Sequence, residues 1–172
     1  MITQYFTASD GARIAYYVDD FSPPWQEART LLLMHSAMGN SERFFSMVPG
    51  LARHYRVVRF DLRGHGRSHR PKADEAFSLK RLTMDAVELL DRLGVKQAHI
   101  VGNSAGGYVA QRIAIEHPER ALSLATYGST PGLNRAALDW LPRVAKEGLT
   151  SFLADTIAMR FDLKTTNPAL VQ

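Results

Sequence analysis

Short apolar runs alternate with longer periodic stretches through the middle of the chain. The runs TLLLMH (30–35) and YRVVRFD (55–61) have the length and the continuous apolar character of strands that are covered on both faces. Between Ser78 and Gly94, apolar residues recur at the spacing of a helix, about 3.6 residues. This pattern predicts one amphipathic helix, which Ser78 caps at its start and Gly94 ends.

The remaining segments extend the same alternation. The stretch QYFTASDGARIAYYVDD predicts a hairpin that turns at SDG, while AHIVGN and ALSLATYG predict two more strands. Helices are expected within 41–54, over 104–117 and, beyond Pro131, over about 135–147 and 149–161. This order predicts an α/β fold: a mostly parallel sheet with an N-terminal antiparallel hairpin and helices on both faces.

Three loops follow predicted parallel strands. Their sequences are HSAMGN, DLRGHGRS and GNSAGG. Ligands of open α/β sheets bind at the carboxyl ends of the strands. We therefore expect the functional residues of this chain in these three loops.

The segment GNSAG (102–106) matches the G-x-S-x-G pattern, in which a serine occupies a strained turn between a strand and a helix. Its flanking glycines are needed because the turn brings them against neighbouring backbone. Here a predicted strand precedes the pattern and a predicted helix follows it, so the context favours a presented nucleophile over a tight glycine loop. Ser104 is therefore the candidate nucleophile, at the positive end of the helix dipole.

A serine that attacks a carbonyl also needs two N–H donors at the position where the oxyanion forms. One donor comes from the residue after the nucleophile, here Ala105. The other comes from the loop after an earlier strand, and in HSAMGN we assign it to Ala37, with Met38 as the neighbour that could replace it.

The segments HSAMGN, VVRFDLRGHGRS and AHIVGNSAGGYVAQRIAIEHPERALSLATYG, in this order, resemble the α/β-hydrolase family over about residues 3–130. The resemblance implies that Ser104 is the nucleophile and that the N–H groups of Ala37 and Ala105 form the oxyanion hole. Residues 1–132 would form the N-terminal part of the hydrolase core. Residues 133–172 are similar to the start of a helical cap, with a pattern like that of 3-oxoadipate enol-lactonases and their relatives.

Serine at position 104 narrows the chemistry that the resemblance implies. Haloalkane dehalogenases and epoxide hydrolases of this fold use an aspartate nucleophile. A serine indicates esters, lactones, thioesters or the carbon–carbon bonds of diketones. Many members carry His-Gly before the oxyanion residue, whereas this chain carries His35-Ser36.

A serine nucleophile needs a histidine base and an acid that orients the histidine, and the family order is serine, acid, histidine. The segment YGSTPGLN offers no carboxylate, and beyond Ser104 the chain has one histidine, His117. A helix over 104–117 would place it roughly 20 Å along the axis from Ser104. The expectation is that these residues are the first part of a longer hydrolase and are inactive alone.

Five further residues are candidates for the substrate pocket: His35, Met38, Asn103, Tyr108 and Trp140. A structural role is favoured for His35, Tyr108 could face the sheet instead of the pocket, and helix-face packing is the alternative for Trp140. Asp61 and Arg63, in the second loop, are expected to brace that loop, although Arg63 could also hold a substrate carboxylate.

Composition excludes several other classes. The 172 residues carry a net charge of +4 and no cysteine, so disulfides and thiolate metal sites are absent and a reducing cytoplasm is the simplest location. No run is long enough to span a membrane, no ligand spacing for a metal occurs, and GNSAGG lacks the spacing of a nucleotide loop. We expect no cofactor and no nucleic-acid partner.

The expected partner is a small ester or lactone, and a homo-oligomer or a C-terminal segment could complete the fold. Two alternatives to a serine hydrolase stay open. The first is a non-catalytic ligand-binding or receptor-like member of the same fold. The second is one piece of a cleaved or split hydrolase whose other piece supplies the acid and the histidine.

Overall fold

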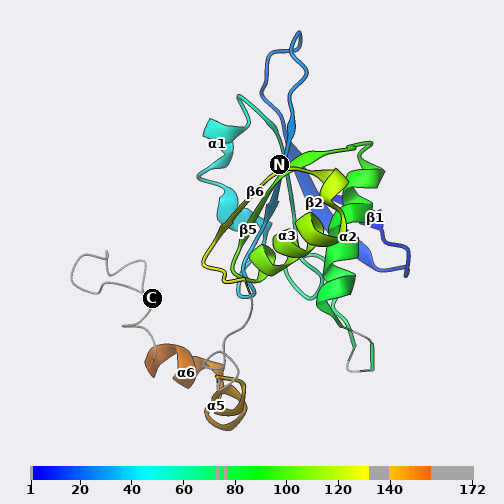
Figure 1. Cartoon of the computed structure of the whole chain (residues 1–172). Helices are drawn as coiled ribbons and strands as arrows, with labels where there is room; N and C mark the ends of the chain where they lie inside the picture. The colour runs from blue at the N-terminus through cyan, green and yellow to red at the C-terminus, as the bar shows by residue number, and fades with distance from the viewer. Residues whose placement is uncertain (1, 73, 76, 132–139, 156–172) are drawn as a thin grey trace, which may run out of the picture. The chain divides into compact units, whose positions relative to one another are not determined.

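The computed structural model describes residues 2–72, 74–75, 77–131 and 140–155. By its internal contacts the chain divides into two units, Met1–Pro131 and Gly132–Gln172. The first unit contains the sheet and the three loops that follow its parallel strands (Figure 1). The predicted cap segments 133–139 and 156–172 lie outside the described residues.

Six strands form one mixed sheet in the order β1-β2-β4-β3-β5-β6. β1 and β2 pair in antiparallel fashion and β2 is antiparallel to β4, whereas β4, β3, β5 and β6 run parallel. The predicted mostly parallel sheet with an N-terminal antiparallel hairpin is confirmed. The strands are β1 (Gln4–Thr7), β2 (Arg13–Asp19), β3 (Thr30–Met34), β4 (Arg56–Phe60), β5 (Ala98–Asn103) and β6 (Ala121–Tyr127).

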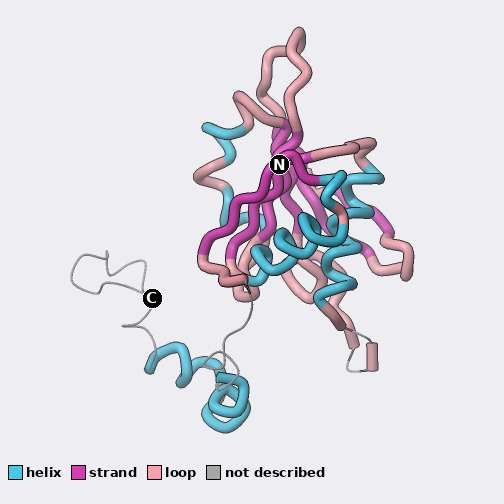
Figure 2. The backbone as a smooth tube through the Cα atoms, viewed as in Figure 1, coloured by secondary structure: helices cyan, strands magenta, loops and turns pink. Residues whose placement is uncertain are grey.

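Helices cover both faces of the sheet, as predicted (Figure 2). α2 (Leu79–Arg92) and α3 (Ala105–Glu116) bury their apolar sides in the larger core cluster, and the short η2 (Pro118–Arg120) follows α3. The hydroxyl of Ser78 accepts a hydrogen bond from the Arg81 N–H at 3.1 Å, so the predicted N-cap is confirmed.

The opposite face is covered by two short helices, where the sequence predicted a helix within residues 41–54. These are η1 (Ser41–Phe44) and α1 (Val48–Leu51). Pro49 explains the break between them, because it has no N–H to donate to the preceding turn and its ring crowds that turn. Phe44 and Val48 still pack on β3 and β4, in a second core cluster.

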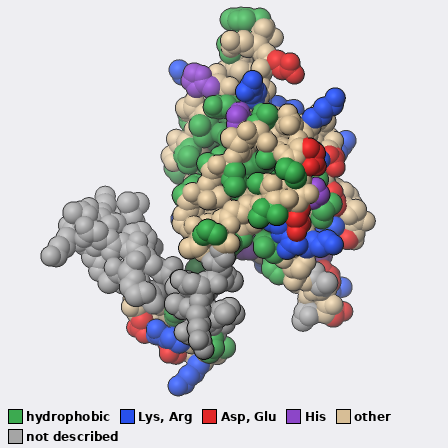
Figure 3. All heavy atoms as spheres, in the orientation of Figure 1, with side chains coloured by type: hydrophobic (Ala, Val, Ile, Leu, Met, Phe, Trp, Pro, Cys, Tyr) green, Lys and Arg blue, Asp and Glu red, His purple; other side chains and the backbone are tan. Residues whose placement is uncertain are grey.

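β6 is the outer strand of the sheet among the described residues, with β5 as its pairing strand. Leu122, Leu124 and Tyr127 on this strand are exposed. The face of the molecule in Figure 3 carries hydrophobic side chains scattered among polar and charged ones. Tyr127 pairs with Asn103 in the register of the two strands. The end of β6 therefore lies directly beside the residue that precedes Ser104.

The described part of the second unit is a helical pair, α5 (Trp140–Glu147) and α6 (Leu149–Asp155), with Gly148 at a φ of +82° between them. Arg143 pairs with Glu147 at 2.9 Å and with Asp155 at 3.1 Å. Its guanidinium also lies 5.4 Å from the centre of the Phe152 ring. Within the described residues no helix is long and apolar enough to cross a membrane.

Candidate active site

The three loops predicted to carry function meet around one buried histidine, His35. Its carbonyl accepts a hydrogen bond from the Gly106 N–H at 3.0 Å, which joins the loop after β3 to the start of α3. Its Nε2 accepts a hydrogen bond from the Leu62 N–H at 2.8 Å, which joins it to the loop after β4. The carboxyl ends of β3, β4 and β5 thus form one connected site.

Ser104 lies at the turn from β5 into α3, as the motif predicts. Its φ is 50° and its ψ is −113°, and it is the one non-glycine residue with a positive φ in the described part of the chain. A backbone region that favours glycine is costly for serine, so the surrounding contacts must hold it there. The strain is confined to the residue predicted to be the nucleophile.

The glycines on either side of Ser104 are required by close packing of backbone. A Cβ atom added to Gly102 would lie 2.3 Å from the carbonyl oxygen of Gly106. A Cβ atom added to Gly106 would lie 2.3 Å from the carbonyl oxygen of Met34, at the end of β3. α3 therefore begins in direct contact with β3, which brings Ser104 toward the loop that follows β3.

Three polar groups in this region have no hydrogen-bond partner among the described residues: the Ala37 N–H, the Ala105 N–H and the Ser104 hydroxyl. The Ala105 N–H belongs to the first turn of α3, whose dipole favours negative charge. Free donors at the mouth of a strand-to-helix turn are what an oxyanion requires. Both predicted donors are thus available to a ligand.

His35 has a structural role in this site. Its Nε2 accepts the Leu62 N–H, so Nδ1 carries the proton and donates to the Ser36 carbonyl at 2.7 Å. Burial lowers the pKa of His35 below its ordinary value of 6.5, which favours this neutral form. The bond to Ser36 fixes the plane of the Ser36–Ala37 peptide and therefore the direction of the Ala37 N–H.

His65, from the loop after β4, holds the next peptide. Its Nε2 lies in hydrogen-bond contact with the carbonyl oxygen of Ala37. Its ring packs edge-on against the ring of His35, with 5.2 Å between the ring centres. The two peptides that flank the Cα of Ala37 are thus each held by a histidine. The sequence placed His65 in a loop at this edge of the sheet but gave no sign of this contact.

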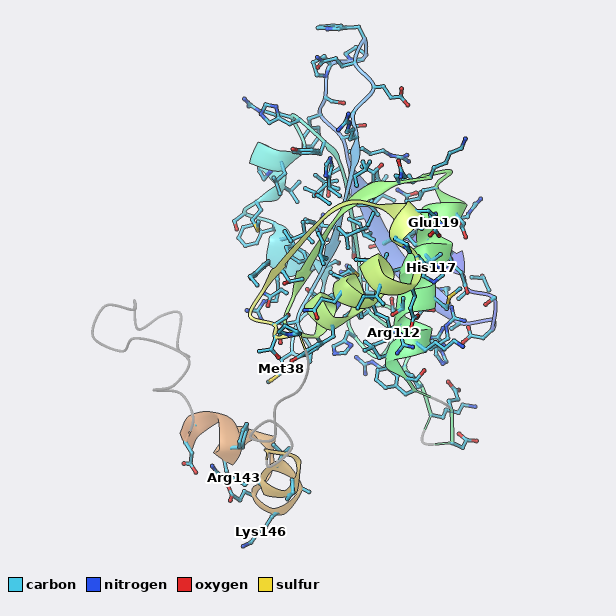
Figure 4. The ribbon with its side chains drawn as sticks, in the orientation of Figure 1. Met38, Arg112, His117, Glu119, Arg143 and Lys146 are labelled. Carbon is cyan, nitrogen blue, oxygen red and sulfur yellow. The ribbon has the colours of Figure 1, made fainter. Side chains whose placement is uncertain are left out.

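The other predicted pocket residues occupy different surroundings. Met38 is 53% exposed on the loop after β3, where Figure 4 shows it near the start of α3. Asn103 is half-buried at the end of β5, and the Tyr108 hydroxyl lies 3.4 Å from the Thr130 hydroxyl. Trp140 is the first residue of α5, and its side chain lies outside the described residues.

No described histidine or carboxylate is hydrogen-bonded to Ser104. His117 ends α3 at the opposite end from Ser104, where its ring lies 3.8 Å from Glu119, and Figure 4 shows both of them far along the helix from Met38. Asp61 is buried and accepts hydrogen bonds from Ser41 and from the Arg67 N–H. Its expected role as a loop anchor is confirmed.

Arg63 was expected to brace its loop, with a substrate carboxylate as the alternative, and the structure shows the bracing role, made through side-chain carboxylates rather than backbone. Its guanidinium is 4% exposed and binds the carboxylate of Asp85 through two hydrogen bonds of 2.8 and 2.9 Å. It also pairs with Asp10 at 2.8 Å. These partners attach the loop to α2 and to the hairpin turn, so Arg63 is not free for a ligand. The long separation in sequence, 53 residues between Arg63 and Asp10, hid this pairing.

One residue beside Ser104 was missed altogether. The hydroxyl of Ser129, just beyond β6, donates a hydrogen bond to the Ser104 carbonyl at 2.7 Å. A sequence signal for it existed in Gly107, which the G-x-S-x-G pattern leaves unexplained. A metal centre is not indicated: the described residues contain no group of three or more histidines, cysteines and carboxylates that could hold an ion.

Comparison with known proteins identifies the family. A family model described as the alpha/beta hydrolase fold matches residues 29–161. A fluoroacetate dehalogenase of Burkholderia is 38% identical over 104 residues, or 59% of this chain and 34% of its own. Epoxide hydrolase B of Mycobacterium tuberculosis is 40% identical over 114 residues, or 64% of this chain and 31% of its own.

Solved structures agree with the family model. An enol-lactonase from Burkholderia xenovorans gives a TM-score of 0.80 at 28% identity, over 98% of this chain and 64% of its own. A hydrolase from Pseudomonas aeruginosa gives 0.77 at 33% identity, over 97% of this chain and 63% of its own. The chain spans about a third of the length of the two curated relatives named above. It belongs to the alpha/beta hydrolase fold family.

Proposed function

We propose that this protein is a serine hydrolase that forms an acyl-enzyme on Ser104. The observation that carries the proposal is a serine at positive φ with a free hydroxyl, followed by the free N–H of Ala105, while the loop that carries the free N–H of Ala37 is joined to the start of α3 by the bond from Gly106 to His35. Strain of this kind persists where the surrounding structure enforces it, and it gathers at reactive sites.

The proposed reaction has two steps. Ser104 Oγ attacks the substrate carbonyl carbon and gives its proton to a base, while the carbonyl oxygen becomes an oxyanion that accepts hydrogen bonds from Ala37 and Ala105. The carbonyl re-forms as the bond to the alcohol oxygen breaks, and the base returns the proton to that oxygen. Water then attacks the acyl-serine in the same way, which releases a carboxylic acid and restores the hydroxyl.

The proposed substrate is a small ester, a lactone or a related carbonyl compound. Serine as nucleophile supports an acyl-enzyme rather than the aspartate chemistry that the resemblance assigns to dehalogenases and epoxide hydrolases. The structural likeness to an enol-lactonase supports a lactone-type substrate. With no cysteine in the chain, we place the protein in a reducing cytoplasm.

One observation favours a second candidate. Among the described residues, no histidine is bonded to the Ser104 hydroxyl, so the base of the first step must come from elsewhere. A ligand-binding member of the family would need no base. A cleaved or split hydrolase would receive it from its other piece.

Labelling with a fluorophosphonate probe tests the proposal. The probe should be applied to the 172-residue chain and to a polypeptide of the relatives' length that carries it. We expect the longer polypeptide to be labelled on the peptide that contains Ser104, and Ser104→Ala to abolish the label. Ser123→Ala, a serine on the same sheet whose hydroxyl binds His99 at 2.8 Å, is the matched control and should label normally.

Label that persists in Ser104→Ala would contradict the nucleophile. A folded longer polypeptide that binds an ester or lactone tightly but is never labelled would favour the binding protein. Intact mass of the purified sample shows whether a second piece has co-purified.

A further inference from the structure

Both backbone groups of Ser104 are held by the end of β6. The Ser104 N–H donates to the Tyr127 carbonyl at 3.0 Å, and the Ser104 carbonyl accepts from the Ser129 hydroxyl at 2.7 Å. A residue with a positive φ relaxes unless its neighbours prevent it. The segment from Tyr127 to Ser129 is therefore placed to oppose that relaxation.

Two glycines make room for this contact. Gly128 has a φ of +63°, which lets the chain turn at the end of β6 and bring Ser129 back over the turn from β5 into α3 that holds Ser104, the elbow. At Gly107, an added Cβ atom would lie 1.9 Å from the Ser129 hydroxyl oxygen and 2.7 Å from its Cβ. Gly102 and Gly106 serve the packing of the elbow itself, whereas Gly107 provides the space that Ser129 occupies.

The Ser129 bond is additional to the normal bonding of the helix. The Ser104 carbonyl already accepts the N–H groups of Gly107 at 2.9 Å and of Tyr108 at 3.3 Å, in the first turn of α3. Removal of the Ser129 hydroxyl therefore leaves no orphaned carbonyl and no large cavity. What it removes is a directional restraint on the peptide that follows the nucleophile. That peptide also carries the N–H of Ala105.

We propose that Ser129 is a positioning residue for the Ser104 nucleophile and for the oxyanion donor on Ala105. Its hydroxyl fixes the orientation of the Ser104–Ala105 peptide, and so sets the direction of the Ala105 N–H relative to the attacking oxygen. The inference rests on the proposed acyl transfer at Ser104. It adds a residue outside the elbow on which the rate of that step depends.

The test compares Ser129→Ala, Ser129→Thr and Ser123→Ala with the unaltered protein in the longer polypeptide. Ser129→Ala should react with the fluorophosphonate about 5- to 10-fold more slowly, the effect of losing one directional hydrogen bond at a reacting group. With an ester substrate the loss should appear in kcat and leave KM unchanged. Ser129→Thr, which keeps the hydroxyl, should restore the rate to within about twofold. Ser123→Ala should match the unaltered protein.

A second measurement does not depend on activity. The ¹³C shift of the Ser104 carbonyl, measured by NMR, should move in Ser129→Ala and stay in place in Ser123→Ala, while the melting temperatures remain similar. Normal labelling of Ser129→Ala would overturn the positioning role, and so would an unmoved carbonyl shift. A complete lack of labelling of the unaltered longer polypeptide would instead count against acyl transfer itself, even where the carbonyl shift moves as expected.

Discussion

In the loop after β4, the charged side chains are hydrogen-bonded or ion-paired with groups close by. Asp61 accepts hydrogen bonds from Ser41 and Arg67, and Arg63 is bound on two sides by carboxylates. No buried side-chain nitrogen or oxygen among the described residues lacks a partner. In the loops after β3 and β5, at the same edge of the sheet, the Ala37 and Ala105 N–H groups and the Ser104 hydroxyl have no described partner.

The comparison distinguishes residues that stabilise the fold from groups that are available to a ligand, at the same edge of the sheet. The charged side chains of the loop after β4 offer a substrate no unpaired charge, because Asp61, Arg63 and Arg67 are each bound by groups nearby. In the loops after β3 and β5, the free N–H groups can bind a ligand. The strained backbone of Ser104 lowers the stability of the fold. Arg63 is the charged residue that the sequence suggested as a ligand contact, whereas Ser104 is the proposed nucleophile, and its hydroxyl has no described partner.

The largest expected effect on stability is at Asp85 of α2, the carboxylate that binds Arg63 of the loop after β4. Asp85 is fully buried and binds both Arg63 and Arg81, so Asp85→Ala leaves a buried arginine without its main partner. Loss of one partner of a buried ion pair costs about 3–5 kcal/mol of unfolding free energy. Urea denaturation at pH 7 measures it. The control is Glu116→Ala, which breaks the exposed pair with Arg112 and should change little. Equal losses in the two variants would contradict the account.

The next effect tests the close approach at the elbow. Gly106→Ala places a methyl group 2.3 Å from the Met34 carbonyl oxygen, so α3 must shift away from β3. We expect a loss of about 1–3 kcal/mol or more, typical of an overpacked core. Gly50→Ala in α1, where an added Cβ meets nothing within 4 Å, is the matched control. It should be neutral or slightly stabilising, since alanine favours a helix over glycine. A neutral Gly106→Ala would show that the elbow is looser than described.

The strain at Ser104 predicts an effect of the opposite sign. Ser104→Gly should be more stable than Ser104→Ala by about 1 kcal/mol, because glycine adopts the positive φ without strain, although it loses more entropy on folding. Both variants lack the hydroxyl, so the difference between their free energies of unfolding, measured by thermal or urea denaturation, reports the backbone strain at position 104. The account requires that glycine, which destabilises most positions, be the better residue here. A less stable glycine variant would mean that the turn is unstrained.

The smallest expected effect is a pH dependence from His35. Burial lowers the pKa of His35 in the folded protein below 6.5. As the pH falls below 6.5, the histidine is therefore protonated in the unfolded chain before it is protonated in the folded protein. The contribution of neutral His35 to the free energy of unfolding is therefore fully present above pH 6.5. It decreases as the pH falls from 6.5 toward the folded-state pKa, by at most about 1.4 kcal/mol per pH unit. His65, Asp61 and Arg43 also act on this ring, so the slope is compared with that of His35→Gln. Identical slopes from pH 7 to 5 would contradict the neutral, buried assignment.

The sequence predicted the parts of this molecule that depend on local periodicity. The α2 helix with its Ser78 cap, the strand order along the chain and the strand-to-helix placement of Ser104 follow from residues within about one or two helical turns of each other. The short helix expected within residues 41–54 is present as α1, but the structure adds a second one, η1, before it, and the break at Pro49 was not predicted.

Periodicity could not predict the hydrogen bonds between loops that orient the backbone groups of the site. His65 meets the Ala37 carbonyl across 28 residues, and Ser129 meets the Ser104 carbonyl across 25. Local periodicity indicates which loops lie at the carboxyl edge of the sheet, but not which of their side chains and carbonyls contact one another. The surplus glycine at position 107 was a signal of close approach, and only the structure identifies the hydroxyl that approaches it.

The central claim is that Ser104, Ala37 and Ala105 form one acyl-transfer site. A crystal structure of the longer polypeptide after reaction with a fluorophosphonate tests it most directly. The account predicts phosphorus bonded to Ser104 Oγ, with a phosphonyl oxygen about 2.7–3.1 Å from both the Ala37 and Ala105 nitrogens. An adduct on another residue, or an oxygen on Ser104 that points away from both amides, would contradict the claim.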